Sequence, residues 1–239
     1  MIGKYPCAWY RLEEDLDMSS VTLIMTSKIR FGGTFDGNGK CICNLKIRDV
    51  NSVSVGLFGT IETGATIKNL KIKNVSVIGA SCVGVIAGEN NGNIINCELS
   101  GVLVQGFFDV GGLVGSSACQ AKIRGCVVDG TVLGNVNVGG IVGNNLVGAK
   151  ITKCFSGGKL CGLENVGGIA GQNHGEIVFS CSDAKMKSQK VAGKLVGLNW
   201  GKVRLERDKF LQKHCDEVLI FTELIGRNWV VFGGSSNHD

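Results

Sequence analysis

Short runs of alternating apolar and polar residues, separated by turns rich in glycine and asparagine, recur along most of the chain. The clearest run has the form Val-Gly-Gly-Φ-Φ-Gly, where Φ is apolar, and it occurs at 110–115, 138–143 and 166–171. Shorter or degraded copies lie at 55–59, 83–88 and 191–197. The closing glycines are at 59, 88, 115, 143, 171 and 197, in steps of 29, 27, 28, 28 and 26 residues. A period held this closely predicts stacked structural repeats.

A second pattern recurs in each repeat, in which an isoleucine is followed three residues later by leucine or cysteine. The copies are Ile42/Leu45, Ile67/Leu70, Ile94/Cys97, Ile123/Cys126, Ile151/Cys154 and, with valine in place of isoleucine, Val178/Cys181. An alternating strand and a glycine or asparagine corner then lead into the next Val-Gly-Gly run. Three short strands per repeat, each paired with its equivalent in the next repeat, predict an all-β, parallel, three-sided β-solenoid. It would have about seven coils of 27–28 residues, with right-handed winding favoured.

The two ends of the chain depart from the repeat and are predicted to cap the open edges of the array. Residues 1–30 are expected to form an N-terminal cap with the first strands, and residues around Trp9 fit either a helical face or a short extended segment. Residues 31–203 are the repeats. Residues 204–239 are expected to form a C-terminal cap and tail, with a short helix permitted over 201–216 and with Trp200 and Trp229 in the cap core. The whole chain is expected to be one structural domain.

These repeats resemble the GLUG motif family, because 110–126, 138–154 and 166–181 follow its Val-Gly-Gly strand, turn and Ile-x-x-Cys strand almost position by position. The stretch 31–45, with Phe-Asp-Gly-Asn-Gly-Lys, and the stretch 10–17 resemble the opening coil of such arrays. The resemblance covers roughly residues 9–205. It implies an accessory, stalk or adhesive module of the kind found in bacterial surface proteins and some secreted peptidases. Those peptidases carry a zinc motif elsewhere, and this chain has no His-Glu-x-x-His.

Composition adds limits on the class of protein. Glycine is abundant (37) and proline occurs once, which suits a backbone that needs its N–H groups for ladder hydrogen bonds. The formal charge of +5 permits an acidic partner without requiring one. No run reaches 18 apolar residues, so no membrane span is predicted. The first residues lack the apolar core of a signal peptide. Localisation is therefore open between the cytoplasm, delivery by another route, and a fragment of a longer surface or secreted protein.

Four of the eleven cysteines, Cys97, Cys126, Cys154 and Cys181, are expected to stack as a column of small buried thiols. Successive members would lie about 5 Å apart with parallel side chains, which does not suit a disulfide. The remaining cysteines favour a reducing compartment, and they are Cys7, Cys41, Cys43, Cys82, Cys119, Cys161 and Cys215. No Cys-x-x-Cys and only three histidines occur, so no metal site and no cofactor is predicted.

The acidic residues do not predict a catalytic centre. A polysaccharide-cleaving β-helix needs two or three carboxylates clustered on one face. The acids here are scattered over different repeat positions, at Glu62, Glu89, Glu98, Asp109, Asp129, Glu164 and Glu176. Asp36-Gly-Asn-Gly predicts a tight turn rather than a calcium loop, because the later ligands are missing. His174 replaces a turn residue and is expected to face solvent.

One basic feature follows the period and is the candidate binding stripe. Its members flank the isoleucine positions, where strand alternation would direct them outward, and they are Lys68, Lys122, Arg124, Lys150, Lys153, Lys202 and Arg204. The stripe could bind an acidic glycan or an acidic protein, or it could be a solvated face. No aromatic residues interleave with it, which disfavours nucleic acid.

The sequence therefore predicts a non-catalytic binding or structural module. Its form would be a rigid, adhesin-like β-solenoid that presents a repeated surface to a protein or a glycan. Two alternatives remain. One is a β-helix enzyme that acts on polysaccharide, and the other is a self-assembling structural protein, of virion or surface-layer type, that stacks through its ends.

Overall fold

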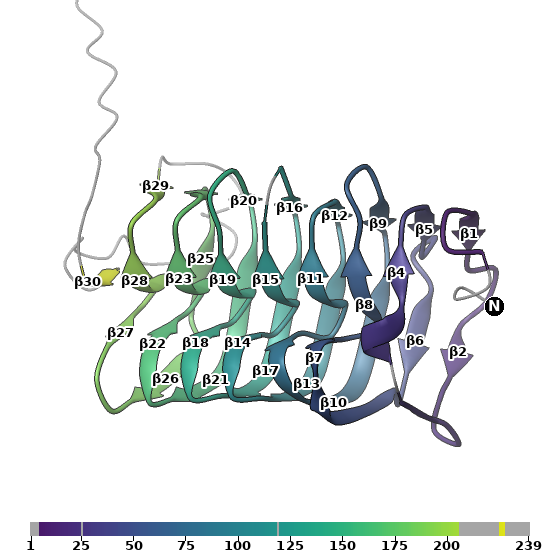
Figure 1. Ribbon diagram of the computed structural model, residues 1–239, viewed down its shortest axis with the longest axis horizontal. Coiled ribbons are helices and arrows are strands. Elements are labelled where there is room, and N and C mark those ends of the chain that lie inside the picture. The colour runs from purple at the N-terminus through teal and green to yellow at the C-terminus, as the bar shows by residue number, and fades with distance from the viewer. Residues whose placement is uncertain (1–4, 25, 119, 206–224, 228–239) are drawn as a thin grey trace, which may run out of the picture.

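The computed structural model describes residues 5–24, 26–118 and 120–205 and the backbone of 225–227. Its strands wind into successive coils that lie side by side along one long axis, from the N-terminal coil at one end (Figure 1). Strands of one coil pair in parallel with those of the next, as in β12 (Asn93–Ile95) with β16 (Lys122–Arg124). The structure confirms the predicted all-β parallel solenoid of about seven coils.

The coils contribute to three sheets, named A, B and C. Sheet A contains β1 (Trp9–Arg11), β5 (Thr34–Asp36), β9 (Thr66–Lys68), β12, β16, β20 (Lys150–Thr152), β24 (Glu176–Val178) and β29 (Lys202–Arg204). Sheet C contains β4 (Arg30–Phe31), β8 (Phe58–Ile61), β11 (Ala87–Asn90), β15 (Val114–Ser117), β19 (Val142–Asn145), β23 (Ala170–Asn173), β28 (Val196–Asn199) and β30 (Ile225–Arg227).

Sheet B is the widest of the three, because most coils cross it with two strands or one long strand. It contains β2 (Leu16–Asp17), β3 (Thr22–Leu23), β6 (Cys41–Cys43), β7 (Lys46–Val55), β10 (Lys71–Val83), β13 (Glu98–Gln105), β14 (Phe108–Gly111), β17 (Val127–Leu133), β18 (Val136–Gly139), β21 (Phe155–Gly162), β22 (Glu164–Gly167), β25 (Cys181–Ser182), β26 (Lys185–Ser188) and β27 (Ala192–Gly193). The 3-10 helix η1 (Thr26–Lys28) lies between β3 and β4.

The core is built from stacked columns of identical or similar side chains. In sheet A the inward column is Tyr10, Phe35, Ile67, Ile94, Ile123, Ile151, Ile177 and Val203. From Ile67 onward its members follow one another in steps of 27, 29, 28, 26 and 26 residues. Each coil shares its buried surface with both neighbours, which is why the repeats are stable only as an array.

The pairing corrects the sequence alignment at both ends of the array. Ile42 does not belong to the inward column of sheet A, because it pairs with Ile72 in sheet B and Phe35 occupies the column position. The tight turn at Asp36-Gly-Asn-Gly, with the backbone N–H of Asn38 donating to Asp36 Oδ1 at 2.9 Å, separates these two strands. At the other end Ile177, and not Val178, pairs with Ile151. At each end the sequence offers two apolar residues near the expected position, Phe35 and Ile42 at one end and Ile177 and Val178 at the other. Only the strand pairing shows which of the two belongs to the column.

The cysteine column is shorter than predicted. Cys97, Cys126 and Cys154 are buried free thiols, as expected. A hydrogen bond to the Cys126 sulfur and burial raise the pKa of Cys97 well above the usual thiol value, and burial and a hydrogen bond to the Cys154 sulfur do the same for the pKa of Cys126. The fourth position is occupied by Ser180, whose Oγ accepts a hydrogen bond from the Cys154 backbone N–H at 3.1 Å. Cys181 instead pairs with Phe155 in the outward column of sheet B and is disulfide-bonded, so the prediction of a free core thiol is wrong there.

A ladder of buried amides runs along the C-terminal ends of the strands of sheet C. Nδ2 of Asn145 donates to Oδ1 of Asn173 at 2.7 Å, and Nδ2 of Asn173 donates to Oδ1 of Asn199 at 2.7 Å. All three residues are fully buried. The same ladder holds Asn90 against Ser117 with a longer contact of 3.4 Å. A buried amide must be hydrogen-bonded to be tolerated, so the ladder also favours the in-register stacking of coils.

The closing glycine of each Val-Gly-Gly run is required by a close backbone approach. A Cβ at Gly143 would lie 2.3 Å from the carbonyl carbon of Asp109, in the preceding coil. Asp109 itself lies within β14 of sheet B and has a positive φ of 52°. The neighbouring coils repeat this contact, for example between Gly171 and Asn137. The glycines are therefore part of the scaffold and not a ligand-binding loop.

The predicted caps are only partly described. The strands β1, β2, β3 and β4 pair in parallel with strands of the next coil, for example Trp9 with Thr34, so the residues around Trp9 form an extended segment and not a helix. The expectation that Trp200 lies in a cap core is wrong, because its side chain is 56% exposed. Trp229 and the short helix expected over 201–216 lie outside the described residues, apart from β29 at 202–204.

Gly143→Ala is predicted to lower the free energy of unfolding by at least about 2 kcal/mol, because the new methyl group meets backbone that cannot move independently. The matched control is Gly32→Ala, whose Cβ would meet only the flexible side chain of Cys7, with Sγ at 3.1 Å. Denaturant unfolding followed by circular dichroism measures both. An equal effect of the two substitutions would contradict the close-approach explanation.

Candidate binding surface

The outward face of sheet A presents two columns of side chains on either side of the buried inward column. The first column is Trp9, Thr34, Thr66, Asn93, Lys122, Lys150, Glu176 and Lys202. The second is Arg11, Asp36, Lys68, Ile95, Arg124, Thr152, Val178 and Arg204. Strand alternation explains the arrangement, since residues i and i+2 lie on the same side of a strand.

The structure places six of the seven predicted stripe residues in these columns. Lys122, Lys150 and Lys202 lie in the first column, and Lys68, Arg124 and Arg204 lie in the second. Lys153 is not brought together with them. It follows β20 at a corner with a positive φ of 53°, and its Nζ lies 6.0 Å from the centroid of the Phe179 ring.

Ion pairs neutralise some of these cations. Nζ of Lys68 lies 3.4 Å from a carboxylate oxygen of Asp36, and Glu176 is shared by Lys150 at 3.0 Å and Arg204 at 3.5 Å. Lys122, Arg124 and Lys202 are exposed and have no ion pair within the described part of the chain.

We call the outward residues of β16, β20, β24 and β29 the basic face. It carries five cations, Lys122, Arg124, Lys150, Lys202 and Arg204, against the single carboxylate of Glu176.

Towards the N-terminus the basic face ends at β12, whose outward residues Asn93 and Ile95 are uncharged, and two coils further on Asp36 of β5 lies beside Lys68 in the second column. Burial alone would raise the pKa of Asp36. Hydrogen bonds from the Asn38 backbone and the Asn69 side chain, together with the nearby charge of Lys68, outweigh burial and lower that pKa. Asp36 is therefore firmly ionised at neutral pH and compensates Lys68.

A second repeated surface lies at the corner between sheets B and C, and we call it the corner row. Its members all have positive φ and are Ser54, Cys82, Asp109, Asn137 and Asn165. Nδ2 of Asn137 donates to Asp109 at 2.8 Å, and Nδ2 of Asn165 donates to Asn137 at 2.9 Å. Asparagine and aspartate tolerate this backbone conformation better than most residues, which accounts for the composition of the row.

Two carboxylates that the sequence left scattered, Glu89 and Asp109, both lie near Cys82 of this row. Burial is the main cause that raises the pKa of Cys82 to about 11, and the charges of Asp109 and Glu89 add to it. Glu89 extends outward from sheet C and accepts a hydrogen bond from Ser54 Oγ at 2.6 Å. Burial also raises the pKa of Asp109, although hydrogen bonds from Asn137 and Asn144 oppose the shift.

His174, expected to face solvent, is partly buried, and its Nε2 lies 2.9 Å from Nε2 of Gln172.

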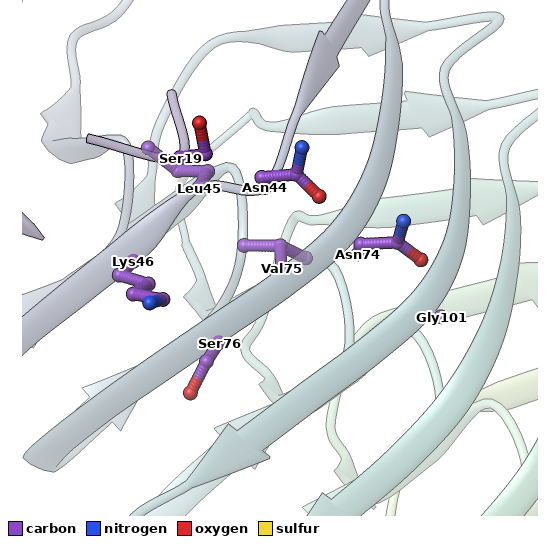
Figure 2. Close-up of a pocket in the computed structure, with 8 residues that line it drawn as sticks. All are labelled: Ser19, Asn44, Leu45, Lys46, Asn74, Val75, Ser76 and Gly101. Carbon is purple, nitrogen blue, oxygen red and sulfur yellow. The ribbon is translucent and has the colours of Figure 1, made fainter. Parts of the chain in front are cut away.

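A shallow groove of about 440 Å³ crosses the outer face of sheet B near the N-terminal end. Figure 2 shows Asn44, in the bend between β6 and β7, beside Asn74 of β10, with Gly101 next along the row and Lys46 and Ser76 nearby. Asn44, Asn74 and Gly101 all have positive φ. The sequence pattern alone does not mark these residues as a site. The recurrence of asparagine and glycine one repeat apart was the available signal, but it does not differ from an ordinary corner.

Comparisons with known proteins support the architecture. No protein-family model matches the chain, so membership of the GLUG family stays a prediction. A segment of 93 residues, 39% of this chain, is 45% identical to Halomucin of Haloquadratum walsbyi (strain DSM 16790 / HBSQ001). The match spans 1% of the length of Halomucin.

Among solved structures, the chain is similar to one named "putative immunoglobulin A1 protease" from Bacteroides ovatus. The TM-score is 0.66 at 21% identity, over 82% of this chain and 68% of that one. At this identity the likeness shows the fold alone. Within the described residues, no helix is long and apolar enough to cross a membrane.

Asp109→Asn is predicted to stabilise the protein by about 0.5–1 kcal/mol at pH 7. The substitution removes a buried charge and continues the asparagine row. The Asn144 side-chain amide donates to Asp109 and its Oδ1 has no partner, so this amide can rotate and accept the new amide hydrogen through Oδ1. Because the folded-state pKa of Asp109 is raised, its ionised form destabilises the fold above that pKa. The advantage of the variant should therefore shrink as the pH falls and vanish below the unfolded value of about 3.9.

The measurement is denaturant unfolding from pH 7 to pH 3. Asp129→Asn is the matched control, because Asp129 is an exposed aspartate on β17. It should change stability by less than about 0.5 kcal/mol throughout. A loss of stability in Asp109→Asn at pH 7 would contradict the prediction.

Proposed function

We propose that this protein is a non-catalytic binding module whose basic face binds an acidic polysaccharide. The observation that carries the proposal is the excess of five cations over one carboxylate on the outward side of four successive strands. Lys122, Arg124 and Lys202 are exposed and available to a ligand.

The spacing of the basic face suits a linear polyanion. Neighbouring strands of a sheet lie about 4.8 Å apart, and three of the four strands of the basic face, β16, β20 and β29, carry at least one cation. A polysaccharide that carries an acidic group on each sugar, or on every second sugar, would meet a new cation at nearly every coil. Such binding adds many weak contacts, each screened by salt because the cations are exposed.

The rigidity of the face supports the same proposal. The strands β16, β20 and β24 are each paired on both sides, so the cations project from a backbone that is already ordered. A preorganised surface loses less conformational entropy on binding than a flexible basic segment would. Ion pairs with Glu176 further restrict Lys150 and Arg204.

The double variant Lys122→Gln/Arg124→Gln is predicted to weaken binding of heparin or polygalacturonate about tenfold, a change of about 1.4 kcal/mol. Both residues lie on β16, where no carboxylate faces them in the described structure. Isothermal titration or surface-immobilised polysaccharide measures the affinity at two salt concentrations. Neutral dextran should not bind.

The matched control is Lys185→Gln/Lys187→Gln, which removes the same charge from exposed positions of β26 in sheet B. It should leave the affinity within about twofold of wild type, since these residues lie outside the basic face. Equal weakening by both variants would show that net charge, and not this face, determines binding.

Glu176→Gln is predicted to tighten polysaccharide binding severalfold, because it frees Lys150 and Arg204 and removes the one repulsive charge of the face. Stability should change by less than about 1 kcal/mol, since exposed ion pairs contribute little. Affinity and thermal unfolding measured on the same preparation separate the two effects. Weaker binding of this variant would exclude the basic face as the site.

A second candidate is hydrolysis of a polysaccharide at the corner row. The observation that favours it is the approach of Glu89 and Asp109 to Cys82, with a raised pKa at Asp109 that suits a general acid. Release of reducing ends from a panel of polysaccharides, abolished in Asp109→Asn, would establish this activity. No release from any member of the panel would leave the corner row as a structural feature.

A further inference from the structure

Two cysteines lie side by side near the N-terminal end of sheet B, outside the basic face and the corner row. Cys41 and Cys43 belong to β6 and flank Ile42, which is buried in the core. Alternation along the strand places both thiols on the outward side. Their Sγ atoms are 3.0 Å apart.

The surroundings of the pair differ from those of the buried cysteine column. Cys41 is 8% exposed, while Cys43 is only partly buried, so a small molecule can reach the second sulfur. Strand β2 lies on one side of β6 and places Asp17 beside Cys43, and β10 lies on the other and places Lys73 there. Asp15 Oδ1 accepts a hydrogen bond from the Cys41 backbone N–H at 2.8 Å.

The two thiols are differentiated by burial. Burial is the largest cause that raises the pKa of Cys41 to about 11, and its hydrogen bond to Cys43 adds to the shift, while the charge of Lys73 opposes it. Cys41 is therefore a protonated thiol at neutral pH, and its sulfur lies within hydrogen-bond distance of Cys43. The more accessible Cys43 is the sulfur that can react first with a reagent in solution.

The backbone geometry allows the two sulfurs to bond. Two residues along a strand advance about 6.6–6.8 Å, at the upper end of the roughly 4.4–6.8 Å usual between the Cα atoms of a disulfide. Closure would therefore need a small contraction of β6. A disulfide formed under such strain is more easily reduced than an unstrained one, so the bond would be reversible.

We infer that Cys41 and Cys43 form a reversible dithiol–disulfide couple that is oxidised by a low-molecular-weight disulfide such as oxidised glutathione. The Cys43 thiolate, its proton lost to water, attacks one sulfur of the glutathione disulfide. That S–S bond breaks, a mixed disulfide forms on Cys43, and the first glutathione thiolate leaves and takes up a proton.

Closure follows within the pair. Cys41 loses its proton and attacks Sγ of Cys43, the bond to glutathione breaks, and a second glutathione leaves and is protonated. Two cysteine thiols have then been oxidised to one disulfide, and one glutathione disulfide has been reduced to two thiols. Reduced glutathione in excess runs both steps backwards.

The experiment uses the full chain, reduced and freed of reductant, then incubated with oxidised glutathione, quenched in acid and alkylated. Peptide mapping follows residues 41–46, which trypsin releases as one peptide containing both cysteines. We expect this peptide to lose both alkylation sites without retaining glutathione. The exposed single thiol of Cys7 provides the internal control, because it should hold a stable glutathione adduct under the same conditions. Full alkylation of Cys41 and Cys43 when Cys7 has reacted would overturn the inference.

The variant Cys41→Ser removes the second step and keeps the first. Glutathione on Cys43 should then accumulate about tenfold or more above its level in wild type, because a neighbouring thiol no longer displaces it. Cys161→Ser is the matched control on the outer side of sheet B, and it should leave closure between Cys41 and Cys43 unchanged. Equal adduct levels on Cys43 in wild type and Cys41→Ser would refute the couple. The wild-type mapping decides the question by itself if Cys41→Ser does not fold.

Discussion

The parallel pairing of each coil with the next is the constraint on which the rest of the structure depends. It requires equivalent residues to stack directly above one another, so every position of the repeat becomes a column along the rod. Apolar columns, such as the one from Ile67 to Val203, fill the interior. Buried polar residues hydrogen-bond along the column, as Asn173 shows by accepting from Asn145 and donating to Asn199.

The same constraint shapes the surface. A cation placed outward in one coil is followed, at the strand spacing, by whatever the next coil carries at that position. This is how Lys122 and Lys150 become neighbours although 28 residues separate them in the chain. It also explains why a single acid neutralises two cations of the basic face, since Glu176 lies between basic coils and forms ion pairs with both Lys150 and Arg204. The sharp corners, in contrast, are made by backbone conformation, with glycine opposite a residue of positive φ.

Reading the sequence was most reliable where the repeat is regular. The period, the alternation within strands and the glycine positions were sufficient to predict the solenoid, its coil number and the outward direction of six stripe residues. Errors arose where the chain offered two similar residues near one expected position. Ile42 and Val178 were predicted in the wrong column, and Cys181 was predicted at the buried position that Ser180 occupies. Hydrophobicity alone does not specify which residue pairs with which.

The sequence by itself determined the architecture, because a strict period combined with glycine corners leaves few ways to bury the apolar positions. Tertiary structure alone decided which charges face each other, which carboxylates approach Cys82, and which thiols are accessible. These depend on distances between coils and on small insertions such as the turn at Asp36-Gly-Asn-Gly, which a one-dimensional pattern does not contain. The adjacency of Cys41 and Cys43 was visible in the sequence as Cys-x-Cys. That their sulfurs lie 3.0 Å apart, one of them open to solvent, was decided by the packing of β6 between β2 and β10.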